Sequence, residues 1–138
     1  MVLAALTLGF GGLSFSGYYR RTAASNAAHV FMQDLVLART TAVRTRQAVV
    51  IRFYESQRWY LVETQSDSVE VIRRRFGDAA DIDLSAITLA QTGDSLVFSS
   101  RGIATITGTS GALGEATFSS GTVTYTVYFS SMGSSKIE

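Results

Sequence analysis

The chain has 138 residues, which suits one domain, and apolar types make up 46% of it, enough for a sizeable core. Its 12 basic and 11 acidic residues give a net charge of +1, which excludes nucleic-acid binding through overall charge but not through a local patch. The absence of cysteine excludes a disulfide framework and a thiolate nucleophile, and the single histidine, His29, excludes a multi-histidine metal site. We expect His29 to have a structural or surface role.

Residues 1–19 carry no charged side chain and are strongly apolar at their start. As a helix they would span about 28 Å, close to the thickness of a hydrocarbon core. A signal peptide needs a basic segment before the apolar run, and none is present. A plain membrane anchor is possible, but Arg20 and Arg21 favour a cytoplasmic position for its C-terminal flank. We therefore expect that Met1 is not the natural start and that a basic leader is encoded upstream.

Residues 20–46 have the apolar period of a helix. A stripe at 3-4-3-4 spacing contains Ala28, Phe31, Leu35, Ala38 and Ala42. Four further apolar residues widen this stripe: Val30, Met32, Val36 and Val43. No proline separates residues 20–46 from residues 1–19, so the two segments can form one helix. The glycines between positions 9 and 17 each cost about 1 kcal/mol in a helix, and we expect bending or local melting there.

After Gln47 the pattern changes to that of strands. Residues 48–54 and 58–63 predict a hairpin across the short polar segment 55–57. Further strands are expected at 68–76, 86–90, 94–102, 103–107, 115–120 and 122–129, and the tail forms an edge strand or frays. Alternation splits Arg73, Arg74 and Arg75 between two faces, which favours a solvated edge over a phosphate-binding patch.

These elements predict an α+β fold, in which a long N-terminal helix packs by its C-terminal half on an antiparallel β-sheet domain. The expected helix–sheet contacts are Phe31, Leu35, Ala38, Ala42, Val49 and Ile51, with Trp59 or Leu61 beside them. Nothing in the chain covers the N-terminal half of the helix, which must meet lipid or other subunits. We therefore divide the chain into an apolar segment, 1–19, and a globular domain, 20–138, made of the helix 20–46 and the sheet region 47–138.

Residues 34–53, with the sequence DLVLARTTAVRTRQAVVIRF, resemble the helix-end signature of the GspH/FimT family of type IV pilin-like proteins. The family pattern L-x-x-AR-x-x-A-[IV]-x-x-x-x-x-V is matched by Leu35, Ala38, Arg39, Ala42, Val43 and Val49. Phe98 and Gly102 match the family's F-x-x-x-G element, and RWYLV at 58–62 resembles its aromatic second strand. The terminal element is matched by Gly133 and Lys136. The resemblance covers most of the chain.

The resemblance implies a non-catalytic minor pilin or pseudopilin, without a cofactor, in a type IV pilus or a type II secretion filament. Such a subunit contributes to filament priming or assembly and to protein secretion. It contacts other pilin or pseudopilin subunits through its N-terminal helix. Before assembly it is held in the inner membrane by a single span, with its C-terminal domain in the periplasm. Family members also have a processed leader, methylation and a glutamate five positions into the mature chain; here the first acidic residue is Asp34.

Two other functions stay open. A DNA-binding minor pilin for DNA uptake would need Arg44, Arg46, Arg52 and Lys136 to converge on one face. Some relatives have an arginine-rich ending, which is reduced here to Lys136, so contact with nucleic acid would be weak. A membrane-tethered periplasmic enzyme would need a cleft with at least two convergent titratable groups, and the sequence offers none.

Two smaller features have simple interpretations. Asp78, Asp81 and Asp83 are spaced like calcium ligands, but they lack the glycine and the later glutamate of an EF-hand loop. Arg39 is expected to pack the helix against the sheet or to form an ion pair with Asp34.

Overall fold

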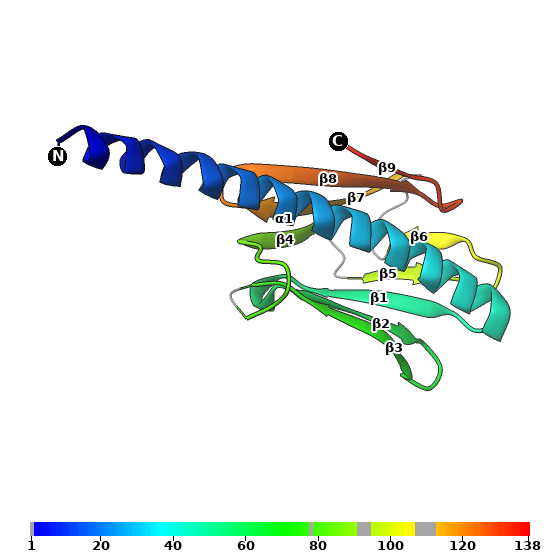
Figure 1. Ribbon diagram of the computed structural model, residues 1–138. Coiled ribbons are helices and arrows are strands. Elements are labelled where there is room, and N and C mark those ends of the chain that lie inside the picture. Colours follow the sequence, from blue (N-terminus) through cyan, green and yellow to red (C-terminus); the bar gives the residue numbers. More distant parts are fainter. Residues whose placement is uncertain (1, 78, 91–94, 107–112) are drawn as a thin grey trace.

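The computed structural model describes residues 2–77, 79–90, 95–106 and 113–138, with the backbone alone at 2–14, 106 and 113. A long helix, α1 (Val2–Thr45), comes first, and the strands follow it in chain order. Figure 1 shows the first half of α1 extending away from the strands and its second half lying against them. The expected α+β architecture is therefore confirmed.

Helix α1 runs without a break through the glycine-rich segment 9–17, so the expected local melting is wrong. Helix propagation is cooperative, and the long flanking helical segments outweigh the cost of the glycines. The helix ends where Arg46 takes a left-handed backbone conformation, with φ of 55°. We expected residues 1–19 to form a membrane or filament-core segment. Among the described residues, no helix is long and apolar enough to cross a membrane.

The strands form two antiparallel sheets instead of the single sheet that the sequence predicted. The first has the order β3-β2-β1-β5-β6, with β1 (Val49–Tyr54), β2 (Trp59–Thr64), β3 (Glu70–Arg75), β5 (Ser95–Phe98) and β6 (Ala104–Ile106). The second has the order β4-β7-β8-β9, with β4 (Ala86–Ala90), β7 (Leu113–Ser120), β8 (Val123–Ser130) and β9 (Ser135–Ile137). Figure 1 shows α1 along the boundary between them, so both sheets can cover its apolar stripe.

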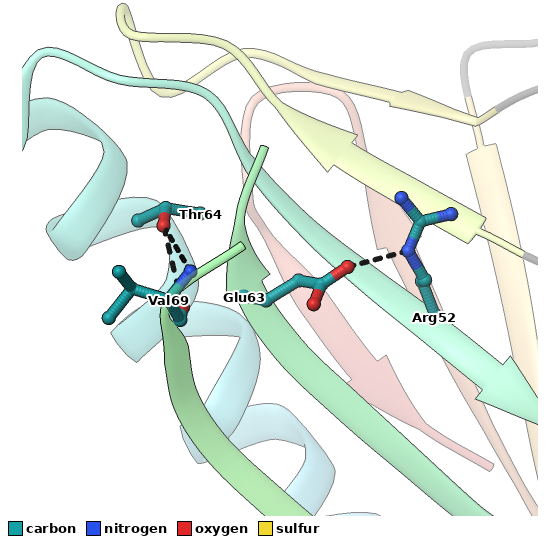
Figure 2. Close-up of polar contacts among 4 residues, drawn as sticks. All are labelled: Arg52, Glu63, Thr64 and Val69. Atoms are coloured by element: carbon teal, nitrogen blue, oxygen red, sulfur yellow. Dashed lines mark hydrogen bonds and ion pairs between the residues drawn. The ribbon is translucent and has the colours of Figure 1, made fainter. Parts of the chain in front are cut away.

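The expected hairpin at 48–63 is confirmed as β1 and β2, joined by the short 3-10 helix η1 (Glu55–Gln57). The next turn, between β2 and β3, is closed by Thr64. The Val69 backbone N–H donates to Thr64 Oγ1 over 3.0 Å (Figure 2). The tail forms the edge strand β9. Of the strands expected at 94–102 and 103–107, residues 94 and 107 lie outside the described residues.

Phe31 of α1 lies at the centre of the core, where it meets aromatic rings from both sheets. Its ring centroid is 5.5 Å from that of Phe53 on β1 and 5.5 Å from that of Tyr60 on β2. On the other side, it is 5.3 Å from Phe118 on β7 and 6.1 Å from Phe129 on β8. One helical side chain therefore ties α1 to both sheets, through edge and tilted contacts of the kind aromatic pairs prefer.

The structure places the six expected helix–sheet residues in one buried cluster: Phe31, Leu35, Ala38, Ala42, Val49 and Ile51. The expectation for β2 is wrong, because Tyr60 and Val62 join this cluster in place of Trp59 or Leu61. Directly opposed residues of an antiparallel pair share a face, and Tyr60 and Val62 oppose Phe53 and Ile51.

Candidate functional site

A buried polar network joins α1 to the first sheet. The Asp34 side chain is 3% exposed, and its carboxylate accepts a hydrogen bond of 2.7 Å from the Tyr60 hydroxyl. Arg74 of β3 donates to both oxygens of Asp34, over 2.9 Å and 3.2 Å. Because a buried carboxylate without partners is costly, these three side chains fix how the helix sits on β2 and β3.

The expected ion pair between Arg39 and Asp34 is wrong, since Asp34 pairs with Arg74. Positions five apart on a helix differ by about 140° around its axis, so their side chains do not face each other. The partner of Asp34 comes from a strand 40 positions away. The signal in the sequence was Asp34 itself, a charged residue three positions from Phe31 on the apolar face of the helix.

The network predicts a loss of stability at high pH. Burial raises the pKa of the Tyr60 hydroxyl well above its usual value of 10.0, and the Asp34 carboxylate raises it further. Tyr60 therefore stabilises the fold below about pH 10, and this contribution falls as the unfolded chain loses its tyrosine proton. Between about pH 10 and 11, the free energy of unfolding should fall by about 1 kcal/mol more in the wild type than in Tyr60→Phe. Urea titrations of both proteins check this, and equal falls would contradict it.

Arg39 lies between two turns that contain glycines with positive φ. Gly102, in the turn between β5 and β6, has φ of 76°, and a Cβ there would lie 3.2 Å from Arg39 Cγ. Gly133, in the turn between β8 and β9, has φ of 84°, and a Cβ there would lie 2.7 Å from Arg39 Nη1. Arg39, Gly102 and Gly133, which all match the family pattern, therefore lie close together. The two turns can approach Arg39 because each has a glycine, without a side chain, at the point of approach.

An open groove runs beside Arg39 along the last turns of α1. We call it the carboxyl-end groove, and it is lined by Val36, Arg39, Thr40, Val43, Arg44 and Gly133. The sequence assigned Val36 and Val43 to the flanks of the apolar stripe, but they are 57% and 50% exposed. This part of the apolar surface is therefore only partly covered by the described chain.

The four cations of the DNA hypothesis do not share one face. Arg44 lines the carboxyl-end groove and Arg46 follows the end of α1, but Arg52 lies on the face of β1 turned away from the helix. Figure 2 shows Arg52 pointing toward Glu63, with its Nε 2.7 Å from Glu63 Oε1. Lys136 on β9 pairs with Glu138, which raises the pKa of the lysine. Two of the four cations therefore already have acidic partners.

This arrangement predicts weak binding to duplex DNA. With Arg44 and Arg46 left to contact phosphates, log K should fall against log salt with a slope of only about −2. The dissociation constant should be roughly 10⁻⁴ to 10⁻⁶ M at physiological salt, the level of non-specific binding. Fluorescence anisotropy at two salt concentrations measures both quantities. Affinity tighter than this range and lost in Arg44→Ala would make DNA uptake the better hypothesis.

The three arginines of β3, His29 and the aspartates with calcium-like spacing do not form a common site in the described part of the chain. Arg73 pairs with Glu70 and lies over the Trp59 ring, Arg74 binds Asp34, and Arg75 is exposed. His29 is exposed on α1. Asp78 of the calcium-like spacing lies outside the described residues, and no group of acidic or histidine side chains within the described part could hold a metal ion.

The chain matches the family described as type II transport protein GspH over residues 27–136. This match covers most of the chain, from Ala27 on α1 to Lys136 on β9. No curated protein matches the chain significantly.

Solved structures of two other proteins share the fold. The type IV minor pilin FimU of Pseudomonas aeruginosa has a TM-score of 0.64 at 15% identity, over 86% of this chain and 90% of that chain. A second crystal form of FimU gives 0.60 at 13% identity, over 83% and 91%. The minor pseudopilin EpsH from the type 2 secretion system of Vibrio cholerae gives 0.55 at 14% identity, over 83% and 95%. At these identities the likeness shows a shared fold.

Proposed function

Because the chain belongs to the family described as type II transport protein GspH, we propose that it is a minor pilin or pseudopilin. It would be a subunit of a type IV pilus or a type II secretion filament, without a catalytic step of its own. The solved structures with the same fold are minor subunits of these two kinds of filament, which supports the proposal. Its role would be in priming or assembling the filament, and through the filament in protein secretion.

The observation that carries the proposal is the division of α1 into a covered and an uncovered half. Ala24, Ala27 and Phe31 are fully buried under the strands. Before them, Phe15, Tyr18 and Tyr19 are 66%, 69% and 69% exposed. Large exposed aromatic side chains in a row are unusual for a monomer and typical of a surface that meets other molecules. We infer that this half of α1 packs among the helices of neighbouring subunits.

The sequence of the first segment suits such packing. Residues 1–19 have no charged side chain, so neighbouring helices meet no buried charge. Small residues at positions 4, 5, 9 and 12 are of the type that lets helices approach closely. In this proposal the same segment holds the subunit at the inner membrane before assembly, with residues 20–138 in the periplasm.

The proposal predicts that a chain without residues 1–21 is soluble and folded but inactive in filament assembly. A chain that begins at Thr22 should be soluble, folded and monomeric, because the exposed aromatic residues lie before it. The full chain should need detergent or partner subunits to stay in solution. Size-exclusion chromatography measures both, and a full chain that is a monodisperse monomer in plain buffer would contradict the proposal.

The matching test of function uses cells that lack the gene. The full chain should restore filament assembly or secretion, whereas the chain that begins at Thr22, exported to the periplasm in equal amount, should not. Full restoration by the shortened chain would show that α1 does not act in assembly.

A further inference from the structure

The carboxyl-end groove has features that helix packing by residues 1–19 does not explain. Val36 and Val43 are exposed on its floor, and Ile103 and Met132 are 45% and 70% exposed on the two turns beside it. A Cβ at Gly102 would lie 3.0 Å from Val43 Cγ2, and a Cβ at Gly133 would lie 2.7 Å from Arg39 Nη1, so both turns adjoin the helix here. In Figure 1 these turns, β5–β6 and β8–β9, lie at the same end of the molecule as the last turns of α1. Apolar surface of this kind, rimmed by polar groups, is typical of a protein contact.

The rim of this surface is basic. Arg39 and Arg44 line the groove, and Arg101 precedes Gly102 in the adjoining turn. Within the described residues, none of these three guanidinium groups has an ion pair or a hydrogen bond, and no acidic side chain lines the groove. An occupant that covers the groove removes water from these cations, which is costly unless it brings carboxylates. Arg39 is also held by the two turns, so it loses little freedom when an acceptor arrives.

We propose that the carboxyl-end groove binds a different filament subunit, through a segment that presents carboxylates beside apolar side chains. This inference rests on the proposed function. Arg39 and Arg44 are five residues apart, which is about 7.5 Å along the helix. They also differ by about 140° around its axis, so they lie on opposite sides of Val36 and Val43. An amphipathic helix with acidic side chains on both flanks of its apolar face can reach both cations while that face covers the two valines.

The charges argue against a second copy as the occupant. The exposed apolar segment of another copy has no acidic residue before Asp34, and Arg20 and Arg21 follow it directly. It would therefore bring further cations to a basic rim, and like charges at an interface oppose binding. The apolar floor argues against DNA, because phosphates gain nothing from Val36 and Val43. The apolar floor and the basic rim together match a protein segment that has an apolar face beside acidic side chains.

In-cell photo-crosslinking tests the proposal in cells that assemble the filament from the full chain. A benzophenone amino acid replaces Val43 in the groove, and a control replaces Val69, which is 55% exposed before β3. We expect an adduct at position 43 with a different pilin-like subunit, mapped by mass spectrometry to a segment that contains aspartate or glutamate. Position 69 should give little of this adduct.

A charge reversal tests the basic rim. Arg44→Glu should lower the adduct yield by about tenfold, as expected for the loss of one attractive charge pair. Arg75→Glu, which reverses an exposed arginine on β3, should leave it unchanged. Both arginines are exposed, so both variants should fold, and equal amounts of chain in the filament fraction would verify this.

Three outcomes would overturn the proposal while the chain is present in filaments. The first is an adduct with a second copy, the second is a nuclease-sensitive adduct, and the third is the absence of any adduct at position 43. An adduct yield that Arg44→Glu leaves unchanged would overturn the role of the basic rim in the same way. A chain that is absent from normally assembled filaments would instead overturn the proposed function, so the two failures are distinguishable.

Discussion

Replacing Phe31 by alanine should lower the free energy of unfolding by about 3–5 kcal/mol, a large share of the stability of a small domain. Phe31 is fully buried and contacts rings from β1, β2, β7 and β8, so the cavity would open between both sheets. Because four strands meet at this ring, the surroundings cannot close the cavity without separating a sheet from α1. Urea unfolding of the chain that begins at Thr22 measures the change.

A matched control for Phe31 is Phe15 on the same helix, which is 66% exposed. Phe15→Ala, made in the full chain in detergent, should change the stability of the domain by less than about 0.5 kcal/mol. A cost below about 1 kcal/mol for Phe31→Ala would show that α1 is not fixed between the sheets through this residue.

Arg74→Met should destabilise the domain by about 3 kcal/mol, because it leaves the buried Asp34 carboxylate with the Tyr60 hydroxyl alone. This is the lower end of the usual stability loss for a broken buried ion pair, because the Arg74 side chain is 39% exposed. The loss acts on the contact between α1 and β3, so the free energy of unfolding from urea titration is again the measurement.

Arg73→Met is the control, because Arg73 and its partner Glu70 are 40% and 48% exposed and exposed ion pairs contribute at most about 1 kcal/mol. A double variant tests whether the instability of Arg74→Met comes from the unpaired Asp34 carboxylate. Replacing Asp34 by leucine together with Arg74→Met removes both charges, so it should recover part of the free energy of unfolding that Arg74→Met loses. Equal costs for Arg73→Met and Arg74→Met would refute a special role for the buried network.

The ring contacts of Phe31 and the hydrogen-bond network of Asp34 also bear on the proposed function. A filament subunit must keep its domain attached to a helix whose other half is held by neighbouring subunits. Phe31 ties α1 to both sheets, and Asp34 ties it to β2 and β3 through Tyr60 and Arg74. The packed half of α1 therefore behaves as part of the domain, and displacement of the helix would transmit directly to the strands.

The periodic parts of the fold could be predicted from the sequence. The spacing of Phe31, Leu35, Ala38 and Ala42 identifies the buried face of α1, because a helix has a fixed period. The hairpin at 48–63 follows from two β-rich runs and a short polar link. Both are local patterns, and the structure needs no distant residue to specify them.

The face of β2 could not be predicted, because RWYLV has apolar side chains at both alternating positions. The inward face depends on the hairpin turn, where η1 and the left-handed Arg58 set Tyr54 opposite Trp59. A shift of one residue would have turned Trp59 and Leu61 inward. The separation of the strands into two sheets likewise depends on pairings between distant segments, such as β1 with β5.

The polar contacts were the hardest to predict, because their partners are far apart in the sequence. Asp34 meets Arg74 only after β3 has paired with β2, and Arg39 meets Gly102 and Gly133 only after two turns have come together. The resemblance singled out Arg39, Gly102 and Gly133 separately. Only the fold shows that they form one place on the molecule, beside the carboxyl-end groove.

Mass spectrometry of filaments purified from cells with natural amounts of the chain tests the filament-subunit role most directly. We expect peptides from residues 22–138 in the filament fraction, in far fewer copies than those of the main subunit. They should disappear from that fraction in cells that carry only the chain beginning at Thr22. Filaments that assemble normally and contain none of these peptides in cells with the full chain would contradict the proposed function.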